Sequence, residues 1–452
     1  MRPLNVLFLL AFVSSAGDPL VDIAPERLAA YIQVDTTNPP GNEIRGVEFL
    51  GAILKQAGIP FEMAESAPGR GNLWARLQGN GKPGLVLLHH IDVVPADASY
   101  WSVDPYAGVT KDGYVYGRGA LDMKALGIMQ LQAFLALHAA GNQLSRDVLY
   151  IATADEEAGG FFGAGWLLEN RPEIAKGVGY LLNEGGGGRQ LGTDTVFFVE
   201  VTQKVPVWLR LTARGRPGHG SVPLPQTAIT RILRAGQRLA DTGFDARVIE
   251  PVANLFRGVA RFQRPELKSA FEEIGAHVTD AAFMQTLQIT APGYHALLRN
   301  TCSPTTLRGS EKINVVPPEA VLELDCRLVP DQDVDEFIAE VTTIVNDRDV
   351  SIERIMSFTP ASSSMDTPLY RLIEAKTDEW FPGSTAIPGV STGFTDSHFF
   401  RDLGIQSYGF SPTVLAENEG VGVHGNDERI SLETLKKGTA FMIDLVQSFA
   451  TD

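Results

Sequence analysis

Residues 147–160 read DVLYIATADEEAGG, an apolar run followed by the adjacent glutamates Glu156 and Glu157. The run 148–153 predicts a buried strand, and groups that follow such strands in an α/β domain lie at the sheet edge where ligands bind. Two neighbouring carboxylates would repel each other unless a cation neutralised one of them. The stretch therefore predicts that one glutamate binds a metal while the other stays free as a general base.

Four further stretches place acidic or imidazole groups after an apolar run or in a Gly-rich loop: His90 and Asp92 in LLHHID, Asp122 in GRGALDMK, Glu184 in LLNEGGGG, and His424 in VHGNDE. Imidazole and carboxylate are ligands that suit divalent zinc. Because alternate residues of a strand face the same way, His90 and Asp92 share a face and His89 points away. We therefore expect His90 to bind metal, Asp92 to accept a ring N–H, and His89 to be a core residue.

Helix-like and strand-like patterns alternate through the first part of the chain. Helices are predicted at 24–33, 43–57, 123–140 and 163–170, and strands at 73–77, 84–94, 148–153 and 180–182. This order is typical of an α/β fold, in which helices cover a mostly parallel sheet.

From about residue 195 the pattern changes. Strands with one solvent-facing side are predicted at 196–203, 207–213 and 320–328, a helix at 227–240, and further helical material at 255–291. The α/β pattern returns with a helix at 369–380, a Gly-rich loop at 389–395, a strand at 405–410 and a helix at 432–449. We interpret residues 202–358 as a second α+β domain, inserted between the two parts of the first domain, residues 17–201 and 359–452.

The net charge of −16 argues against nucleic acid as a partner, because its phosphates would be repelled. Arg2, the apolar run 4–13 and the small residues 14–16 are typical of a signal peptide cleaved after Ala16. The sequence thus predicts a secreted or periplasmic protein, with no membrane span in the mature chain. Cys302 and Cys326 could form a disulfide in such a compartment or remain two small buried residues.

A different site is conceivable around Ser391, which lies in a G-x-S-x-G stretch at 389–393. Such a stretch is typical of the nucleophile elbow of serine hydrolases, with Asp396 and His398 or His424 following in the right order. The preceding segment is a weak strand that contains Pro388, and Asp396 is too close to Ser391 to come from a later strand. These points disfavour a serine hydrolase.

Seven stretches together resemble the aminoacylase, glutamate carboxypeptidase and succinyl-diaminopimelate desuccinylase family of two-zinc metallopeptidases. They are HHIDVVP, GRGALDMK, TADEEAGG, LLNEGG, GRPGHGSVP, INVVPPEA with LDCRLVP, and VHGNDE. The resemblance covers nearly the whole mature chain and implies a catalytic domain with an inserted ferredoxin-like lid domain. The helical material at 255–291 resembles the larger, carboxypeptidase-like branch.

The resemblance also implies roles for single residues. It places His90, Asp122 and Glu184 on one metal ion and Asp122, Glu157 and His424 on the other, with Glu156 as the general base and Asp92 as a positioning residue. It makes His219 a stabiliser of the oxyanion and implies a cis peptide bond after Asp122. Substrate binding would fall to Asn314, Arg327, Gly393 and Thr395, although the stretch STGFTD departs from the family's Gly-Gly-Thr-Asp pattern.

The expected function is that of a two-zinc amidohydrolase, with cobalt or manganese as alternative metals. It would cleave dipeptides or N-acyl amino acids that carry a free carboxylate, by attack of a metal-activated water. A homodimer through the lid domain is conceivable. The alternative from another class is an inactive binding protein on the same scaffold, which would have no need of an unligated base.

Overall fold

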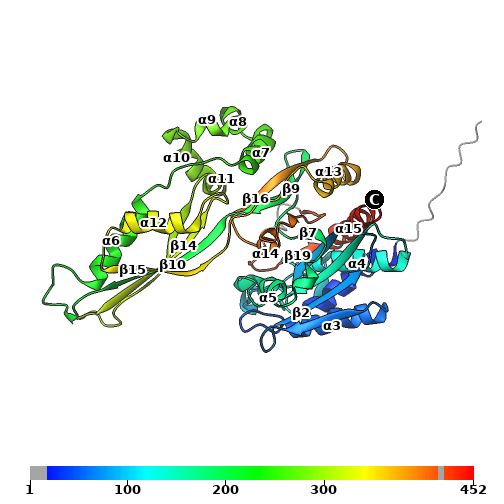
Figure 1. The fold of residues 1–452 in the computed structure, drawn as a ribbon, viewed down its shortest axis with the longest axis horizontal. Coiled ribbons are helices and arrows are strands. Elements are labelled where there is room, and N and C mark those ends of the chain that lie inside the picture. The colour runs from blue at the N-terminus through cyan, green and yellow to red at the C-terminus, as the bar shows by residue number, and fades with distance from the viewer. Residues whose placement is uncertain (1–17, 416–421) are drawn as a thin grey trace, which may run out of the picture.

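The computed structural model describes residues 18–415 and 422–452, which form a large α/β domain and an inserted domain that extends away from it (Figure 1). The predicted signal peptide, residues 1–16, lies outside the described residues. Within the described ranges, no helix is both long enough and apolar enough to cross a membrane.

A ten-stranded sheet lies at the centre of the large domain, in the order β1-β2-β6-β3-β7-β17-β9-β8-β18, with β16 beside β9. Its middle strands β6, β3, β7 and β17 are parallel, whereas β1, β2 and β8 pair antiparallel. The bounds are β1 Phe61–Glu65, β2 Gly71–Leu77, β3 Lys82–His90, β6 Arg146–Thr153, β7 Val178–Asn183, β8 Gly187–Leu191, β9 Asp194–Gln203, β16 Thr385–Ser391, β17 Gln406–Gly409 and β18 Val414–Leu415. The predicted α/β class with a mainly parallel sheet is confirmed.

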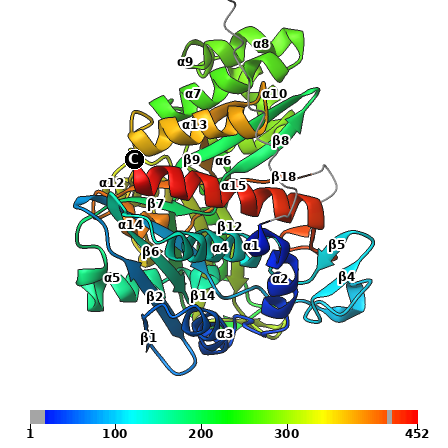
Figure 2. The same cartoon turned by 90° about the vertical axis from the view of Figure 1, so that its right-hand side faces the viewer.

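Consecutive residues of the central strands face opposite layers, which explains their uninterrupted apolar sequence. Leu85 and Leu87 of β3 belong to one hydrophobic core, and Val86 and Leu88 belong to another. The helices of the first core are α2 Ala24–Ile32, α3 Glu43–Gln56, α4 Lys124–Ala140, α13 Pro368–Trp380 and α15 Leu432–Thr451. Those of the second are α5 Ala164–Asn170 and α14 Ser397–Arg401. Helices therefore cover both faces, and α4 and α15 lie side by side on one of them (Figure 2).

The inserted domain contains an antiparallel sheet in the order β12-β14-β10-β15. Its strands are β10 Val205–Arg214, β12 Thr301–Arg308, β14 Glu319–Leu328 and β15 Val350–Ser357, and its helices are α6 Ala228–Asp241 and α12 Val334–Val345. The chain order strand, helix, two strands, helix, strand is that of a ferredoxin-like sandwich. Cys302 and Cys326, which lie opposite each other in β12 and β14, form a disulfide.

Five helices within the inserted segment form a separate core. They are α7 Glu250–Val259, α8 Pro265–Glu272, α9 Ile274–His277, α10 Ala281–Thr290 and α11 Pro292–Leu297. Their apolar side chains pack with Val196 of β9 and Ile387 of β16. These helices, hereafter the helical insert, therefore rest on the sheet of the large domain.

The two domains are joined by nearly continuous strands, because only Lys204 separates β9 from β10 (Figure 1). Lys204 is buried, and its Nζ donates hydrogen bonds to the carbonyl oxygens of Ala296 (2.8 Å) and Arg299 (2.7 Å) and to Oγ1 of Thr301 (3.1 Å). Lys204 thus ties the junction to α11, the last helix of the helical insert, and to the chain that follows it.

The remaining elements are short. Strands β4 Val109–Lys111, β5 Tyr114–Tyr116 and β19 Arg429–Ser431 form a small sheet, β11 Gly218–His219 pairs with β13 Val315–Val316, and α1 Pro19–Asp22 precedes α2.

Two sequence-based expectations about elements are wrong in detail. The strand predicted at 84–94 ends at His90, so Asp92 lies beyond its end. The loop predicted to begin at residue 389 begins later, because β16 continues to Ser391 as a parallel neighbour of β9. Pro388 misled the prediction, although an edge strand tolerates the missing N–H of a proline.

Candidate active site

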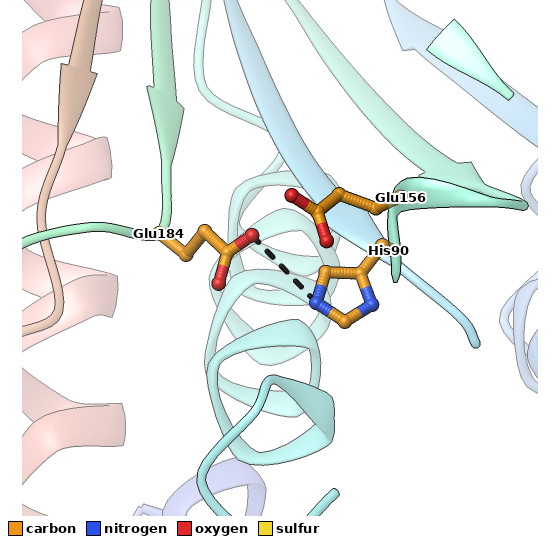
Figure 3. Close-up of side chains that lie close together, drawn as sticks. All are labelled: His90, Glu156 and Glu184. Carbon is orange, nitrogen blue, oxygen red and sulfur yellow. Dashed lines mark ion pairs between the residues drawn. The ribbon is translucent and has the colours of Figure 1, made fainter. Parts of the chain in front are cut away.

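The predicted ligands come from five separate segments that meet at one end of the large sheet. His90 ends β3, Glu156 and Glu157 follow β6, and Glu184 follows β7. Asp122 lies two residues before α4, and His424 lies in the segment before β19. Figure 3 shows His90, Glu156 and Glu184 pointing toward one another. Because β3, β6 and β7 are parallel neighbours, their carboxyl ends bring these side chains together.

Asp122 lies between two imidazoles. Its Oδ1 is 3.1 Å from Nε2 of His90, and its Oδ2 is 3.1 Å from Nε2 of His424. Nε2 of His90 also lies 3.6 Å from Oε1 of Glu184, and Nε2 of His424 lies 3.2 Å from Oε2 of Glu157. The arrangement therefore has two halves that share Asp122.

The donor set fits divalent metal. One ligand atom each from His90, Asp122 and Glu157 lie within 4.8 Å of one another, and the same holds for His90, Glu156 and Glu184. Among the described residues, the buried Oε1 of Glu157 has no hydrogen-bond partner. A buried carboxylate oxygen without a partner is costly, and a cation would satisfy it.

Electrostatics support this reading. Hydrogen bonds with Asp122 and Glu157 raise the pKa of His424 to about 10. Burial lowers the pKa of His90, but the carboxylates of Glu184, Asp122 and Asp92 outweigh it and raise that pKa well above its usual value. The carboxylates thus favour the protonated, positively charged form of both imidazoles. Bound cations would supply the same positive charge to these carboxylates.

Glu156 is buried beside His90 and Glu184. Burial and the nearby charge of Glu184 raise the pKa of its carboxyl well above its usual range. Its carboxylate lies close enough to His90 and Glu184 to share a metal ion with them. The position of Glu156 therefore fits a metal ligand as well as a general base, and its assignment as the general base stays a prediction.

Asp92 fixes the turn that carries the two glutamates. Its Oδ1 accepts a hydrogen bond from the backbone N–H of Glu156 (3.2 Å), and its Oδ2 accepts from the N–H of Glu157 (3.2 Å) and from Nδ2 of Asn38 (2.8 Å). Nδ1 of His90 lies 2.9 Å from the backbone carbonyl oxygen of Asp92 and 3.5 Å from its carboxylate. The expected ring contact therefore involves mainly the backbone of Asp92.

Glu428 fixes the loop that carries Asp122, and the sequence analysis missed it. The side chain is fully buried, and its Oε1 accepts from the N–H groups of Leu121 (2.7 Å) and Asp122 (3.0 Å). Its Oε2 accepts from the N–H of Gly119 (3.0 Å) and from Nη1 of Arg118 (2.7 Å). The signal was its place at the end of VHGNDE, four residues after His424.

Comparison with known proteins agrees with this geometry. The sequence profile of peptidase family M20/M25/M40 matches residues 86–448. The chain belongs to this family. It is therefore an enzyme of the metallopeptidase and amidohydrolase type, in a metal-dependent family.

Individual M20 relatives give the extent of the similarity. The chain is 32% identical to N-fatty-acyl-amino acid synthase/hydrolase PM20D1 of Xenopus tropicalis, over 81% of this chain and 72% of the relative. It is 27% identical to aminoacylase-1 of Sus scrofa, over 93% of this chain and 94% of the relative. The M20 metallo-carboxypeptidase Sso-CP2 of Sulfolobus solfataricus has the same fold, with a TM-score of 0.75 at 19% identity, over 94% and 99% of the two chains.

The structure separates His219 and the substrate-binding residues that the resemblance implies into two groups. Arg327 lies near the domain junction, with its guanidinium 5.5 Å from the ring of Phe394 and paired with Asp325 (Nε to Oδ1 2.7 Å). Thr395 lies there too, because its N–H donates to Oε1 of Gln203 (3.1 Å) at the end of β9. Gly393 is exposed in the same loop.

His219 and Asn314 form the other group. Both are exposed, and the carbonyl oxygen of Asn314 accepts from the N–H of Gly220 (2.8 Å). His219 follows the end of β10 that is remote from the junction, because β10 begins at Val205 and ends at Arg214. Asn314 lies there too, through its contact with Gly220. A single chain in this conformation therefore does not bring them to the metal ligands.

Two further expectations, one from the resemblance and one from strand alternation, agree with the structure. The peptide bond between Asp122 and Met123 is cis, as the resemblance implied. His89 is fully buried in the core, with its ring centroid 5.3 Å from that of Tyr150, as expected.

The structure does not assemble the serine hydrolase alternative. Oγ of Ser391 accepts from the N–H of Gly393 (3.1 Å), and Oδ2 of Asp396 accepts from Oγ1 of Thr153 (2.9 Å). Neither ring nitrogen of His398 has a partner among the described residues. His424 contacts Asp122 and Glu157 instead of Ser391.

Proposed function

We propose that the protein hydrolyses the amide bond of N-acyl amino acids, with dipeptides as the second substrate class. The observation that carries the proposal is the position of Glu156, which is buried beside a carboxylate and imidazole cluster that fits divalent metal. A protein that only bound metal would not need an additional carboxylate there.

The metal ligands would be divided as the two halves of the cluster suggest. His90, Asp122 and Glu184 would hold one ion, and Asp122, Glu157 and His424 the other. Zinc suits this mixed imidazole and carboxylate set best, with cobalt or manganese as alternatives. When bound, the ions would lower the pKa of a water molecule and polarise the substrate carbonyl.

Glu156 would act as the general base. It takes a proton from the attacking water, whose oxygen forms a bond to the carbonyl carbon. The C–N bond then breaks, and Glu156 returns the proton to the leaving amine. Asp92 would support this step by holding the turn on which Glu156 lies, through the backbone N–H groups of Glu156 and Glu157.

The amino acid part of the substrate would bind through its carboxylate. Nη1 of Arg327 is buried without a partner among the described residues, so the guanidinium has a donor to offer. Gly393 and Thr395 would line the same region. The names of the relatives, an N-fatty-acyl-amino acid hydrolase and an aminoacylase, favour N-acyl amino acids over dipeptides.

His219 and Asn314 would complete the site from a second copy of the chain, so we include a homodimer through the inserted domain in the proposal. His219 would donate to the developing oxyanion. We also propose that the mature protein is secreted or periplasmic after cleavage near Ala16, which N-terminal sequencing of the exported protein would check.

One experiment tests the proposal as a whole. The purified protein is loaded with zinc, cobalt or manganese, its metal content is measured, and N-acyl amino acids, dipeptides and their carboxamides are screened for hydrolysis. We expect about two ions per chain, hydrolysis of N-acyl amino acids, and loss of hydrolysis on chelation. Metal-loaded protein that cleaves none of these compounds would contradict the proposed function.

A further inference from the structure

Arg70 lies in the connection between β1 and β2, at one edge of the large sheet, and its side chain is largely buried. Its Nη1 pairs with the buried carboxylate of Glu43 in α3. Its Nη2 donates to Oδ1 of Asp155 (2.7 Å) and to Oδ1 of Asn38 (3.2 Å). One guanidinium therefore joins α3, the segment that precedes α3, and the turn after β6.

Asp155 begins the turn that carries Glu156 and Glu157. Its φ of 71° lies in the left-handed region, which a residue other than glycine rarely adopts unless its surroundings hold it there. Both carboxylate oxygens of Asp155 are held, Oδ1 by Arg70 and Oδ2 by the backbone N–H of Phe162 (3.0 Å). Arg70 therefore helps to fix the start of the turn.

A second route runs from Arg70 to the same turn through Asn38. Oδ1 of Asn38 accepts a hydrogen bond from Arg70, and its Nδ2 donates to Oδ2 of Asp92 (2.8 Å). The carboxylate of Asp92 accepts in turn from the backbone N–H groups of Glu156 and Glu157. A displacement of Asn38 would therefore reach both glutamates through Asp92.

A guanidinium suits this place because it presents five N–H donors in a rigid planar fork and can serve partners on different sides. The carboxylates of Glu43 and Asp155 are buried, and both form an ion pair with Arg70. Among the described residues, Oε2 of Glu43 has no hydrogen-bond partner. Loss of the guanidinium would leave two buried carboxylates without this counter-charge, which strongly disfavours their present positions.

We propose that Arg70 is a positioning residue of the active site, whose guanidinium holds the turn after β6 in the conformation that keeps Glu156 and Glu157 apart. Its hydrogen-bond partners are not themselves predicted metal ligands, so it acts through them. The consequence for turnover rests on the proposed function, because it assumes that Glu156 is the general base. The consequence for the conformation of the turn does not depend on that assumption.

The first test measures the turn itself in the metal-free protein. Arg70→Met keeps an unbranched stem near the ring of Phe162 but removes every donor. In hydrogen exchange followed by mass spectrometry, residues 154–163 should exchange at least tenfold faster than in the parent, because local opening of the turn becomes easier. Peptides from β10 and β14 should exchange as in the parent, which verifies that the variant folds. Exchange of residues 154–163 at the parent's rate would overturn the proposal.

Arg76→Met is the matched control. Arg76 lies on β2, pairs with Asp147 (Nη1 to Oδ2 2.6 Å) and donates to the carbonyl oxygen of Ile174 (2.8 Å). It lies opposite Leu149 in register, whereas the turn follows the other end of β6. This variant loses a comparable ion pair and should leave the exchange of residues 154–163 unchanged. Equal acceleration in both variants would indicate a general loosening of the sheet and would contradict a specific role for Arg70.

Arg70→Lys separates the shape of the guanidinium from its charge. A lysine ammonium remains positive beside Glu43 and Asp155 but lacks the planar set of donors. The variant should fold, and residues 154–163 should exchange faster than in the parent, although less so than in Arg70→Met. Exchange as slow as in the parent would show that positive charge alone suffices, and the role assigned to the guanidinium would be wrong.

The second test measures metal binding and turnover. Competition with a chelator should show the zinc affinity of Arg70→Met reduced by about 10-fold to 100-fold, the usual range for a residue that orients a ligand. In the zinc-saturated variant, kcat on an N-acyl amino acid should fall at least tenfold while KM changes less than twofold, because Arg70 orients the base without binding the substrate. A raised KM with an unchanged kcat would make Arg70 a substrate-binding residue and refute the proposal. If the parent hydrolyses no substrate, the proposed function fails, whereas hydrogen exchange and zinc affinity still decide the role of Arg70.

Discussion

Glu156 and Glu157 are adjacent in sequence, yet their carboxylates have different neighbours. Glu156 is grouped with His90 and Glu184, whereas Glu157 contacts His424. The short turn after β6 allows this because its consecutive side chains diverge. Two different roles for the two carboxylates are therefore sterically feasible.

Glu156→Gln should retain about two metal ions and lower turnover by roughly 100-fold or more, the scale of a lost general base. Glu157→Gln should instead lose metal, because the amide that replaces the carboxylate is a weaker ligand. Metal analysis and steady-state kinetics of both variants distinguish the roles. Near-normal turnover of Glu156→Gln would remove that residue from the role of base.

Arg327 should discriminate an acid from its neutral amide. Its Nε and Nη2 are already held by Asp325, at 2.7 Å and 3.2 Å, which fixes the plane of the guanidinium. A lysine cannot reproduce this planar set of donors. Arg327→Lys should therefore narrow the ratio of kcat/KM between an N-acyl amino acid and its carboxamide. An unchanged ratio would mean that another residue binds the carboxylate.

His398 should make stability depend on pH. Burial and the nearby Arg401 lower the pKa of its imidazole to about 3, and its ring lies 3.5 Å from that of Phe358 between centroids. Between pH 6.5 and 3 the unfolded chain binds a proton at this residue that the folded chain does not bind. The free energy of unfolding therefore falls as pH decreases through this window.

His398→Phe should remove this dependence. Between pH 7.5 and 5, the metal-free parent should lose roughly 2 kcal/mol more of its free energy of unfolding than the variant does. Urea unfolding in the presence of a chelator measures the difference. Equal losses in both proteins would show that His398 is not the group responsible.

At the scale of elements, the loop before α4 depends on a residue from the other end of the chain. Glu428 accepts hydrogen bonds from three backbone N–H groups of this loop, including that of Asp122. In Glu428→Gln, the amide NH2 would face donors where an oxygen now accepts. Metal affinity should fall by about 10-fold to 100-fold, the usual cost of disturbing a residue that orients a ligand.

Asp427→Asn is a control for this prediction. Asp427 is the neighbour of Glu428, but its carboxylate holds the N–H and hydroxyl of Ser102, which lies outside the ligand loop. Its replacement should leave metal affinity close to that of the parent, as measured by competition with a chelator. A comparable loss in both variants would indicate a general effect on the segment before β19.

The elements that the sequence predicted well are those with strong apolar periodicity. The strand at 148–153 and the helix at 123–140 match β6 and α4 closely, because burial on all sides leaves long apolar runs. Strands with many exposed or half-exposed residues, such as β12 and β15, were missed. Their residues pair with neighbouring strands that are distant in sequence, and no local sequence pattern indicates such pairing.

The residues of the site differ in the same way in how well the sequence predicted them. Each predicted metal ligand lies beside the others, because each follows a strand or a Gly-rich turn that sheet topology brings to one place. Asn38 and Glu428 were not predicted as part of the site, since they act through backbone groups and hydrogen bonds of other residues. A sequence shows the type of a side chain but not which distant loop it will hold.

At the scale of the whole molecule, the distance between the junction and the remote end of β10 constrains how the site can be completed. β10 contains ten residues, so its two ends lie roughly 30 Å apart. The junction itself is close to the metal ligands: Gln203 binds Thr395, the adjacent Asp396 binds Thr153, and Thr153 lies opposite His90 in register.

A rigid rotation of the inserted domain about the junction does not change the distance between His219 and the junction. Because the metal ligands are much nearer the junction than His219 is, closure of the inserted domain around Lys204 cannot bring His219 to them. A second copy of the chain can bring its own His219 to these ligands. The end of the inserted domain has apolar side chains suited to such an interface, since Val222 is 65% exposed and Ile313 is fully exposed.

A site that is completed by a second chain predicts complementation between two defective chains. His219→Ala and Glu156→Gln should each be nearly inactive alone, the first because the oxyanion loses its donor and the second because the base is lost. When the two are co-expressed with different tags and purified through both, each hybrid dimer should contain one site with an intact Glu156 from one chain and an intact His219 from the other. Such hybrids should regain roughly half of the parent's turnover per dimer, because one of two symmetric sites is restored. If no hybrid can be isolated, if the hybrid is as inactive as the single variants, or if His219→Ala alone is fully active, then His219 does not complete the site of a partner chain.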